Sequence, residues 1–517
     1  MSKKIIFLIF CFFWCSLISF CQQNKVIPTE KIIGTNHVTK NEIKAKEFLF
    51  TKRVHDFYID SINNYAIIQF RNTERNDESI DNEGSVILFD LNDSSIKWEN
   101  KFDFSDENLY FNDSLIINYT SNKMYLWDLS SGENIWEANN SLYYLFKDQK
   151  IALAYNSSWG KSSNKLEGID IKSGEKVWER KISTDDGWDN IYSINDSIVI
   201  IYSNGFHTLN LNDGKGIDFV SKTNYKNYTY LILTNALGIT LGILTGVFTY
   251  TYDEPIVTSD IQSKILIDSS YLFYASRHNL YKLNQDGTIV WNKKLNKKKI
   301  SNSTLFKKDS IVYMINNGYA IKNGVKVNYG TPSLTAYNTY SGNQIFYSPF
   351  VDKKKKDDMI LDYKVEKDEI VFLFKKSIAR YSLIDGKFIS DRNFNIKEYG
   401  DMVSFIEDNI YHKDNLYYSK ITKTYPKNYN IFTNFGLALS LNEKFETQAL
   451  LEYKDLYFLS LRAKTYEILT NDSLISIINN NGKTITELTL LKDVVIIRDK
   501  LFGKKENSLF MFDLNEE

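Results

Sequence analysis

The residue types that most often carry chemistry are few and scattered in this chain. Histidine occurs five times, at His37, His55, His207, His278 and His412. No two of them lie three or four residues apart, as paired metal ligands on one segment usually do. The sequence also lacks Gly-x-Ser-x-Gly, a phosphate-binding glycine loop and His-Glu-x-x-His. It therefore gives no catalytic residue, no metal ligand set and no cofactor site, and a non-enzymatic protein is favoured.

The net charge, the acidic stretch and the positions of the cysteines limit the kinds of binding site and cross-link that the sequence predicts. The formal net charge is −1, so there is no basic field for nucleic acid. The acidic stretch 185–189 lacks the twelve-residue spacing of a calcium loop, and we interpret it as a connecting turn. The three cysteines Cys11, Cys15 and Cys21 all lie within the first 21 residues. We therefore expect no disulfide in the chain that follows them.

Residues 1–21 have the pattern of a secretory signal peptide. Two early lysines precede an apolar run, and the segment is too short to span a membrane as a helix. Two interpretations of its end stay open. In the first, the residues before Cys21 form a bacterial lipobox and Cys21 is a candidate for lipid attachment. In the second, an ordinary signal peptidase cuts after Cys21, before Gln22.

A repeat of about forty residues dominates the remainder of the chain. Each copy runs an alternating apolar segment into a turn led by aspartate or asparagine, and a large aromatic residue follows. The clear copies end at Trp98, Trp136, Trp178 and Trp291, and degenerate copies end at Phe219, Tyr347 and Ser390. Gly132, Gly174 and Gly287 occupy the turns, where glycine tolerates a positive φ. We predict that these tryptophans and glycines are structural, with each tryptophan docking its outer strand onto the next repeat.

The repeat predicts an all-β fold. Apolar strand openers precede most copies, so each unit has four antiparallel strands, as a propeller blade does. We expect a closed β-propeller of eight blades, with seven and nine as the alternatives. Residues 22–47 are expected to form a lead-in and residues 48–517 the propeller. The segment around Phe48 is expected to pair with the last strand, because the final copy lacks an outer strand.

One apolar segment interrupts the pattern, inside an insertion at about 221–262. Residues 230–250 carry no charge, and Gly238, Gly242 and Gly246 are four residues apart. Three interpretations compete: a membrane-spanning helix, a protruding segment that contacts a membrane or partner, and a segment folded against its own propeller. In the second interpretation, the contact residues are Leu237, Gly238, Gly242, Leu244, Gly246 and Phe248.

The repeat resembles that of the pyrroloquinoline-quinone-type propellers. The resemblance is strongest at 124–136 and 166–178 and weaker at 86–98 and 280–291. Within this superfamily the chain is similar to the non-enzymatic branch, because it has no adjacent cysteine pair after residue 21. That branch includes the lipoprotein propeller of the outer-membrane β-barrel assembly machinery. The resemblance implies a protein-binding scaffold that uses loops on one face, and no quinone cofactor.

The sequence thus favours an exported interaction scaffold with envelope proteins as partners. The expected location is the periplasm or outer membrane of a Gram-negative bacterium, with Cys21 or residues 230–250 as a membrane contact. The alternative is a propeller that binds or transforms a small ligand, a quinone or a glycan, at its central funnel.

Overall fold

A computed structural model gives the fold. It describes residues 25–73, 80–112, 115–158, 161–182, 188, 191–203, 205–220, 225–227, 256–259, 261–268, 270–296, 298–322, 325–350, 359–406, 410–414, 417–420, 429–462, 466–471, 474–488, 492–498 and 500–513. The predictions on the signal peptide, Cys21 and residues 230–250 lie outside these residues, as does most of the acidic stretch 185–189. No helix among the described residues is long and apolar enough to cross a membrane.

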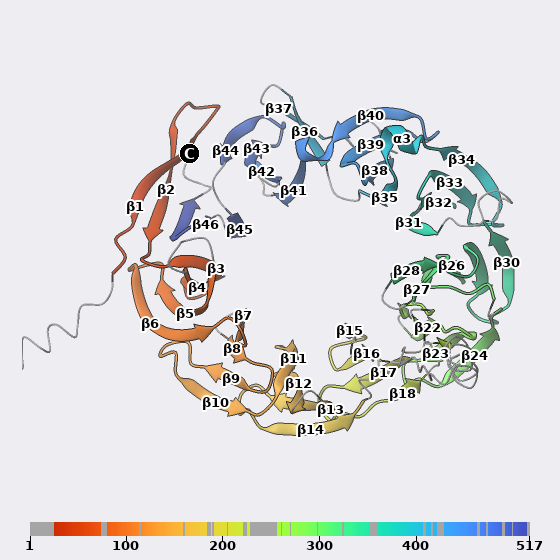
Figure 1. Cartoon of the computed structure of the whole chain (residues 1–517), viewed down its shortest axis with the longest axis horizontal. Helices are drawn as coiled ribbons and strands as arrows, with labels where there is room; N and C mark the ends of the chain where they lie inside the picture. The colour runs from red at the N-terminus through yellow and green to blue at the C-terminus, as the bar shows by residue number, and fades with distance from the viewer. Residues whose placement is uncertain are drawn as a thin grey trace, which may run out of the picture. The chain divides into compact units, whose positions relative to one another are not determined.

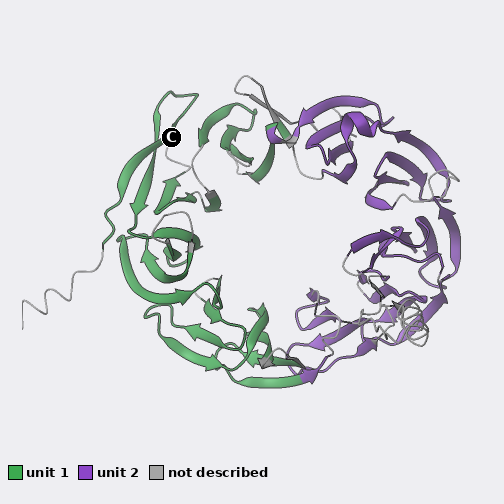
Figure 2. Cartoon of the chain, viewed as in Figure 1, with its two compact units in different colours: residues 1–179, 408–423, 455–517 green, residues 180–407, 424–454 purple. Residues whose placement is uncertain are grey.

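The chain divides into two compact units, which Figure 2 colours separately. The first comprises residues 1–179, 408–423 and 455–517. Its sheets, in hydrogen-bonded order, are β3 (Arg53–Asp60), β4 (Tyr65–Thr73), β5 (Ile80–Asp90) and β6 (Ser95–Asp103); β7 (Asn108–Asn112), β8 (Leu115–Tyr119), β9 (Met124–Trp127) and β10 (Asn134–Ala138); β11 (Ser141–Phe146), β12 (Ile151–Ser158), β13 (Lys161–Asp170) and β14 (Lys176–Lys181); β37 (Tyr417–Lys420), β36 (Ile410–Asp414), β41 (Leu456–Arg462), β42 (Tyr466–Thr470), β43 (Ile475–Asn479) and β44 (Thr484–Leu488); and β1 (Thr29–Thr35), β2 (Glu42–Leu49), β47 (Ser508–Asp513), β46 (Lys500–Lys505) and β45 (Lys492–Ile497).

The second unit comprises residues 180–407 and 424–454. Its sheets are β15 (Ile191–Ser193), β16 (Ile198–Tyr202), β17 (Gly205–Asn210) and β18 (Asp218–Val220); β21 (Leu266–Asp268), β22 (Tyr271–Ala275), β23 (Asn279–Asn284) and β24 (Ile289–Lys294); β25 (Ser303–Lys308), β26 (Ile311–Asn316), β29 (Ser333–Asn338) and β30 (Gln344–Pro349); β31 (Ile360–Val365), β32 (Glu369–Phe374), β33 (Ser377–Ser382) and β34 (Phe388–Asn393); β35 (Met402–Phe405), β38 (Tyr429–Thr433), β39 (Leu437–Leu441) and β40 (Thr447–Glu452); and a smaller sheet of β19 (Tyr225–Asn227), β20 (Ile256–Ser259), β27 (Tyr319–Lys322) and β28 (Val325–Asn328). A short helix, α3 (Ile396–Tyr399), precedes β35, and a 3-10 turn, η1 (Tyr453–Asp455), precedes β41.

The described strands form an all-β propeller of ten blades, five in each unit, so the expected eight blades, and the alternatives of seven and nine, were wrong. The error lies beyond Ser390, where the sequence predicts at least one further blade and closing strands, and the structure has three blades. In two of these blades, Ala449 and Thr486 occupy the outer-strand position that a tryptophan has in the clear repeats. After a one-residue bulge, Ala449 pairs with Ser440 and Thr486 pairs with Ile477. Without an aromatic residue, the repeat cannot be recognised there.

The first and last strands of the propeller share one sheet. β2 pairs with β47 from Lys46↔Met511 to Leu49↔Ser508, as expected for the segment around Phe48. Figure 1 shows the red β2 beside the blue strands of the chain end. Phe48 is 1% exposed and packs on Phe89 of the next blade, with ring centroids 5.2 Å apart. Residues 22–47 therefore contribute β1 and most of β2.

The ends of the apolar insertion are built into a sheet. β19 pairs with β20, and β20 pairs with β27, which belongs to a hairpin between β26 and β29 of a blade. Asn227 and Ile256, the described residues that flank 228–255, therefore pair with each other in this small sheet.

Blades pack on one another through strands that are buried on both faces. In β12 the residues Ile151, Ala152, Leu153 and Ala154 are at most 5% exposed. Of these four, Ala152 and Ala154 belong to a cluster that also contains Ile117 and Leu126 of the preceding blade. Such continuous apolar strands explain why the opener segments read as unbroken apolar runs.

The outer strands carry the contact that joins one blade to the next. A one-residue β-bulge precedes Trp98, Trp136 and Trp291 and turns each indole toward the following blade. There, Trp98 Nε1 donates to the carbonyl oxygen of Leu129 at 2.8 Å, and Trp136 Nε1 donates to that of Ile171 at 2.9 Å. Trp291 Nε1 donates to Thr339 at 3.1 Å. Each acceptor follows the aspartate or asparagine that begins the next turn.

The turn glycines lie directly against these indoles. A Cβ atom on Gly132 would be 2.6 Å from Trp98 Cδ2, and one on Gly174 would be 2.6 Å from Trp136 Cδ2. Gly287 instead faces Ile217, and Gly386 faces Phe346, so the degenerate anchors are Ile217 and Phe346 rather than Phe219 and Tyr347. Trp178 is 8% exposed and lies against Gly168 of its own blade.

Where the anchor is Ser390, arginines join the blades instead. Arg392 Nη2 donates to Thr447 Oγ1 at 2.9 Å, and Arg380 Nη2 donates to the Glu443 carbonyl oxygen at 2.8 Å. Arg380 also donates to the Tyr429 hydroxyl at 2.8 Å. Charge-assisted hydrogen bonds thus take the place of the anchoring aromatic side chain at this blade interface.

Truncation of an anchor is expected to destabilise the first unit. Trp98→Ala removes a buried indole and its inter-blade hydrogen bond, which should cost about 3–5 kcal/mol in the free energy of unfolding. Ile135→Ala, at an outer-strand residue that is 54% exposed, is the control and should cost less than about 0.5 kcal/mol. Calorimetric melting measures both, and wild-type-like melting of Trp98→Ala would contradict the anchoring role.

Two glycines separate backbone strain from steric contact. Gly132 and Gly436 both have φ of +72°, but a Cβ on Gly436 would meet nothing within 4 Å. Gly436→Ala should cost only the left-handed backbone penalty, about 1–2 kcal/mol. Gly132→Ala should cost at least about 1 kcal/mol more, because Trp98 must move. Equal losses in denaturant unfolding would mean that the turn does not depend on the indole.

Candidate functional site

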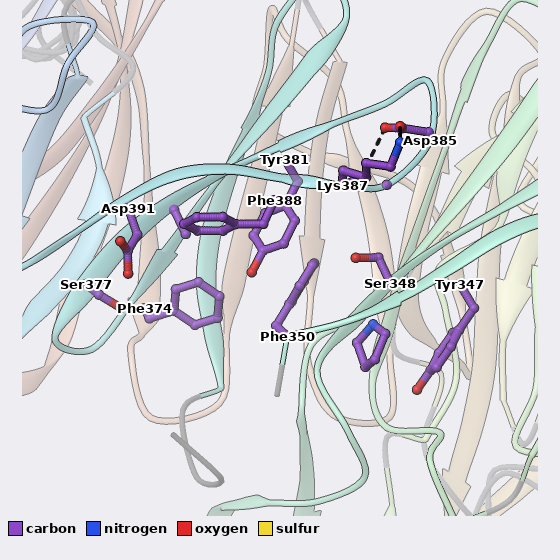
Figure 3. Close-up of a pocket in the computed structure, with 13 residues that line it drawn as sticks. Tyr347, Ser348, Phe350, Phe374, Ser377, Tyr381, Asp385, Lys387, Phe388 and Asp391 are labelled. Carbon is purple, nitrogen blue, oxygen red and sulfur yellow. Dashed lines mark hydrogen bonds and ion pairs between the residues drawn. The ribbon is translucent and has the colours of Figure 1, made fainter. Parts of the chain in front are cut away.

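The second unit has a groove between the outer strands of two adjacent blades, here called the aromatic groove (Figure 3). It encloses about 540 Å³. Its lining comprises Tyr347, Ser348, Pro349, Phe350, Phe374, Ser377, Ala379, Tyr381, Asp385, Gly386, Lys387, Phe388 and Asp391. These residues come from β30 and the residue after it, and from β32, β33, β34 and the turn that joins β33 to β34.

The strand geometry explains why these side chains converge. Alternate residues of β33, namely Ser377, Ala379 and Tyr381, share one face of the sheet. On β34, Phe388 pairs with Tyr381 and Asp391 pairs with Ala379, with a bulge between them. Because the bulge adds one residue, Phe388 and Asp391 lie on the same face although they are three positions apart.

The aromatic rings form a continuous wall. The centroids of Phe350 and Tyr381 are 4.4 Å apart, those of Tyr381 and Phe388 are 5.7 Å apart, and those of Phe350 and Phe374 are 6.2 Å apart. Phe350 and Phe374 are 9% and 6% exposed, whereas Phe388 is 56% exposed. The groove thus has a buried aromatic floor and an exposed aromatic rim.

Two carboxylates flank the wall at opposite ends. In Figure 3, Asp391 lies beside Phe374 and Ser377, and Asp385 lies at the turn with Lys387. Lys387 Nζ is 2.7 Å from Asp385 Oδ2, and its hydrogen bond lowers the pKa of Asp385 to about 2. Burial, together with the charge of Asp391, raises the pKa of Tyr381 to about 12. At neutral pH Tyr381 is therefore a neutral phenol.

A second cavity, of about 640 Å³, lies against the inner strands of the same unit. Amides line part of it: Asn317 Nδ2 donates to Asn302 Oδ1 at 2.8 Å, and Gln262 Oε1 accepts from the Tyr274 hydroxyl at 2.8 Å. Both oxygens of Asp362 accept backbone N–H groups at 2.8 Å. The lining is therefore mostly neutral and hydrogen-bonded internally.

Within the described part of the chain, the histidines are not grouped with other metal-ligating side chains. Among the described residues, no group of three His, Cys, Asp or Glu side chains could hold a metal ion. His207 is buried, with Nδ1 2.7 Å from Asp218 Oδ1 and Nε2 3.0 Å from the Ser203 carbonyl oxygen. Although burial opposes it, the bonds from His207 and Arg180 lower the pKa of Asp218. His207 and Asp218 belong to β17 and β18, whereas Arg180 belongs to β14 of the preceding sheet, so the cluster joins strands of two blades.

None of the residues predicted to be structural lines the aromatic groove. Trp98, Trp136 and Trp291 lie at blade interfaces away from the groove lining, and Cys21 and Leu237–Phe248 are outside the described residues. Sequence reasoning missed Tyr381, Phe388 and Asp391. The only signal was the apolar pair Phe388-Ile389 directly after a turn, at strand positions that are 56% and 44% exposed.

Residues 79–204 match the family model described as outer membrane protein assembly factor BamB. The match spans the repeats at 86–98, 124–136 and 166–178, and it confirms the predicted resemblance to pyrroloquinoline-quinone-type propeller repeats. It covers less than half of the chain's 517 residues. No curated protein matches the sequence.

The similar solved structures have low identities and low TM-scores. BamB from Moraxella catarrhalis is 10% identical, with 78% of this chain and 96% of that chain covered and a TM-score of 0.28. A eukaryotic initiation factor is 11% identical, with coverage of 87% and 99% and a TM-score of 0.35. The computationally designed Ika8 protein is 9% identical, with coverage of 77% and 96% and a TM-score of 0.30. The fold assignment rests on the strand pairing described above.

The titration of Tyr381 tests the groove's electrostatics. Asp391→Asn removes a negative charge, so the pKa of Tyr381 should fall from about 12, yet stay above 10.0 because burial is the larger cause. Carbon-13 NMR of ring-labelled tyrosine measures it, with Tyr381→Phe for assignment. Tyr337, whose pKa burial raises to about 12, is the internal control and should not move. An unchanged pKa of Tyr381 would show that the charge of Asp391 does not act on the Tyr381 hydroxyl group.

Proposed function

We propose that this protein is an exported envelope propeller that acts as a protein-interaction scaffold with a part in outer-membrane protein assembly. The match of residues 79–204 to the BamB family model carries the proposal. The matched family is by its description an outer membrane protein assembly factor, and this description is what suggests protein partners.

The described surface is compatible with such a role. Outer strands of both units carry exposed aliphatic residues, among them Ile135, Val177 and Ile345, which are 54%, 51% and 47% exposed. These side chains, and the exposed rim of the aromatic groove, are available for contact with a partner. Location in the periplasm or at the outer membrane, and anchoring through Cys21 or residues 230–250, are parts of the same proposal.

A ligand-binding propeller is the second candidate. The 640 Å³ cavity favours it, because amides and the rings of Tyr192, Tyr202, Tyr319 and Tyr363 together suit a neutral, hydroxyl-rich ligand such as a glycan. Among the described residues it offers no metal cluster for quinone chemistry.

Partner capture distinguishes the two. The full-length protein, tagged at its C-terminus and purified from its own envelope in mild detergent, should bring down outer-membrane barrel assembly components in stoichiometric amounts by mass spectrometry. An unrelated exported protein with the same tag is the control. Recovery of the propeller alone would count against the scaffold and in favour of the ligand-binding candidate.

A further inference from the structure

The first unit has a cavity of its own, here called the basic cavity, which encloses about 350 Å³. It lies between two blades that contact each other: β3 and the turn after it form one wall, and β45, β46 and the end of β47 form the other. Ile59, Ile497 and Phe502 line it, and all three belong to or pack against one core cluster. The walls of the cavity are therefore fixed by the same packed core.

The lining of the basic cavity carries a net positive charge. Arg498 and Lys500 supply two cations, and among the described residues neither side chain has a hydrogen-bond or ion-pair partner. Asp513 is the one acid of the lining, and it has an interaction of its own. Two cations and one carboxylate leave one positive charge, so a ligand with a single negative charge would balance the cavity.

The backbone at Arg498 indicates that the turn alone does not call for an arginine. Two residues join β45 to β46, and Ile497 pairs with Lys500 across them. Arg498 has a φ of +53°, in the left-handed region where glycine and asparagine are favoured. A residue that is unfavourable for its backbone often marks a position where the side chain serves a function. Here that side chain lines the cavity.

Cations beside an apolar floor suit an anion that carries an apolar group. A guanidinium group donates two parallel N–H groups to a carboxylate, and an ammonium group adds a charge-assisted hydrogen bond. Phe502 is 2% exposed and Ile62 is 68% exposed, so the cavity has a buried apolar floor and an apolar rim. Its volume lies near the lower end of the range for ligand pockets, about 300–1,000 Å³, which restricts the ligand to a small group.

We propose that the basic cavity binds a carboxylate that carries a short apolar group. The carboxylate pairs with Arg498 and Lys500, and the apolar group lies on Ile62, Ile497 and Phe502. A short fatty acid and the last residue of a polypeptide both have this chemistry. The proposal goes beyond the scaffold function and does not depend on it, because the site is complete within the first unit.

Three small probes separate the charge from the apolar group. The full chain, labelled at isoleucine methyl groups, is titrated with hexanoate, with hexanamide, which lacks the charge, and with acetate, which lacks the apolar chain. NMR signals of Ile59, Ile62 and Ile497 report on the cavity, and that of Ile135, in another blade, is the control. We expect hexanoate to bind at least about tenfold more tightly than the other two. Equal affinity for hexanoate and hexanamide would overturn the proposal, as would unmoved signals of all three cavity isoleucines.

Variants assign the site. Arg498→Asn should weaken hexanoate binding by about tenfold without lowering the melting temperature, because asparagine tolerates the left-handed backbone. Lys500→Gln should weaken it to a similar extent. Lys46→Gln removes the same charge from an exposed position on β2 of the same sheet, away from the cavity, and should leave binding unchanged. Unchanged binding in both cavity variants, or an equal loss in Lys46→Gln, would overturn the assignment.

Two peptides distinguish the sources of the carboxylate. Acetyl-Ser-Ala-Leu is titrated with a free terminal carboxylate and with a terminal amide. If the free-carboxylate peptide binds as tightly as hexanoate and the amide does not, the cavity accepts polypeptide C-termini. If hexanoate binds and neither peptide does, the ligand is a free acid. No envelope protein is present in these titrations, so their failure leaves the capture experiment and the scaffold function unaffected.

Discussion

Adjacent blades of this propeller are joined by an outer-strand side chain that lies beneath a left-handed turn of the next blade. The β-bulge before Trp98 aims its indole, Gly132 leaves room above it, and the Leu129 carbonyl oxygen accepts its N–H group. The bulge, the turn glycine and the carbonyl acceptor form one contact. The turn requires glycine because its φ is positive and because the indole ring approaches it closely. The same three parts recur between Trp136 and Gly174.

The propeller tolerates wide variation in the anchor itself. Ile217 and Phe346 lie beneath their turns without any polar atom to donate, and Ser390 leaves the contact to Arg380 and Arg392. Packing against the inner strands evidently supplies enough stability that the outer contact can change its chemistry. The groove lies next to one of these substituted contacts, since its turn at Gly386 covers Phe346.

The sequence predicted the blade architecture wherever the anchor is a tryptophan, because an indole after a fixed turn is a rare pattern. It failed beyond Ser390, where Ala449 and Thr486 occupy the anchor position and the remaining strand pattern is common to all β proteins. The aromatic groove was equally hidden. Phe388 and Asp391 share a face only because a bulge adds a residue, and Phe350 reaches them from another blade. Neither relation can be read from spacing along the chain.

The pairing of β2 with β47 has a consequence for biogenesis. Glu47 accepts a hydrogen bond from Ser508, 461 positions later. The sheet that contains β2 and β47 therefore cannot be completed before residue 508 has been synthesised. Contacts of such high sequence separation form late, because the entropy of closing the intervening loop must be offset first. Until residue 508 is available, β2 and β46 both lack their neighbour. An incomplete chain therefore carries two open strand edges with apolar faces, which are the surfaces through which nascent β proteins aggregate or are retained by chaperones.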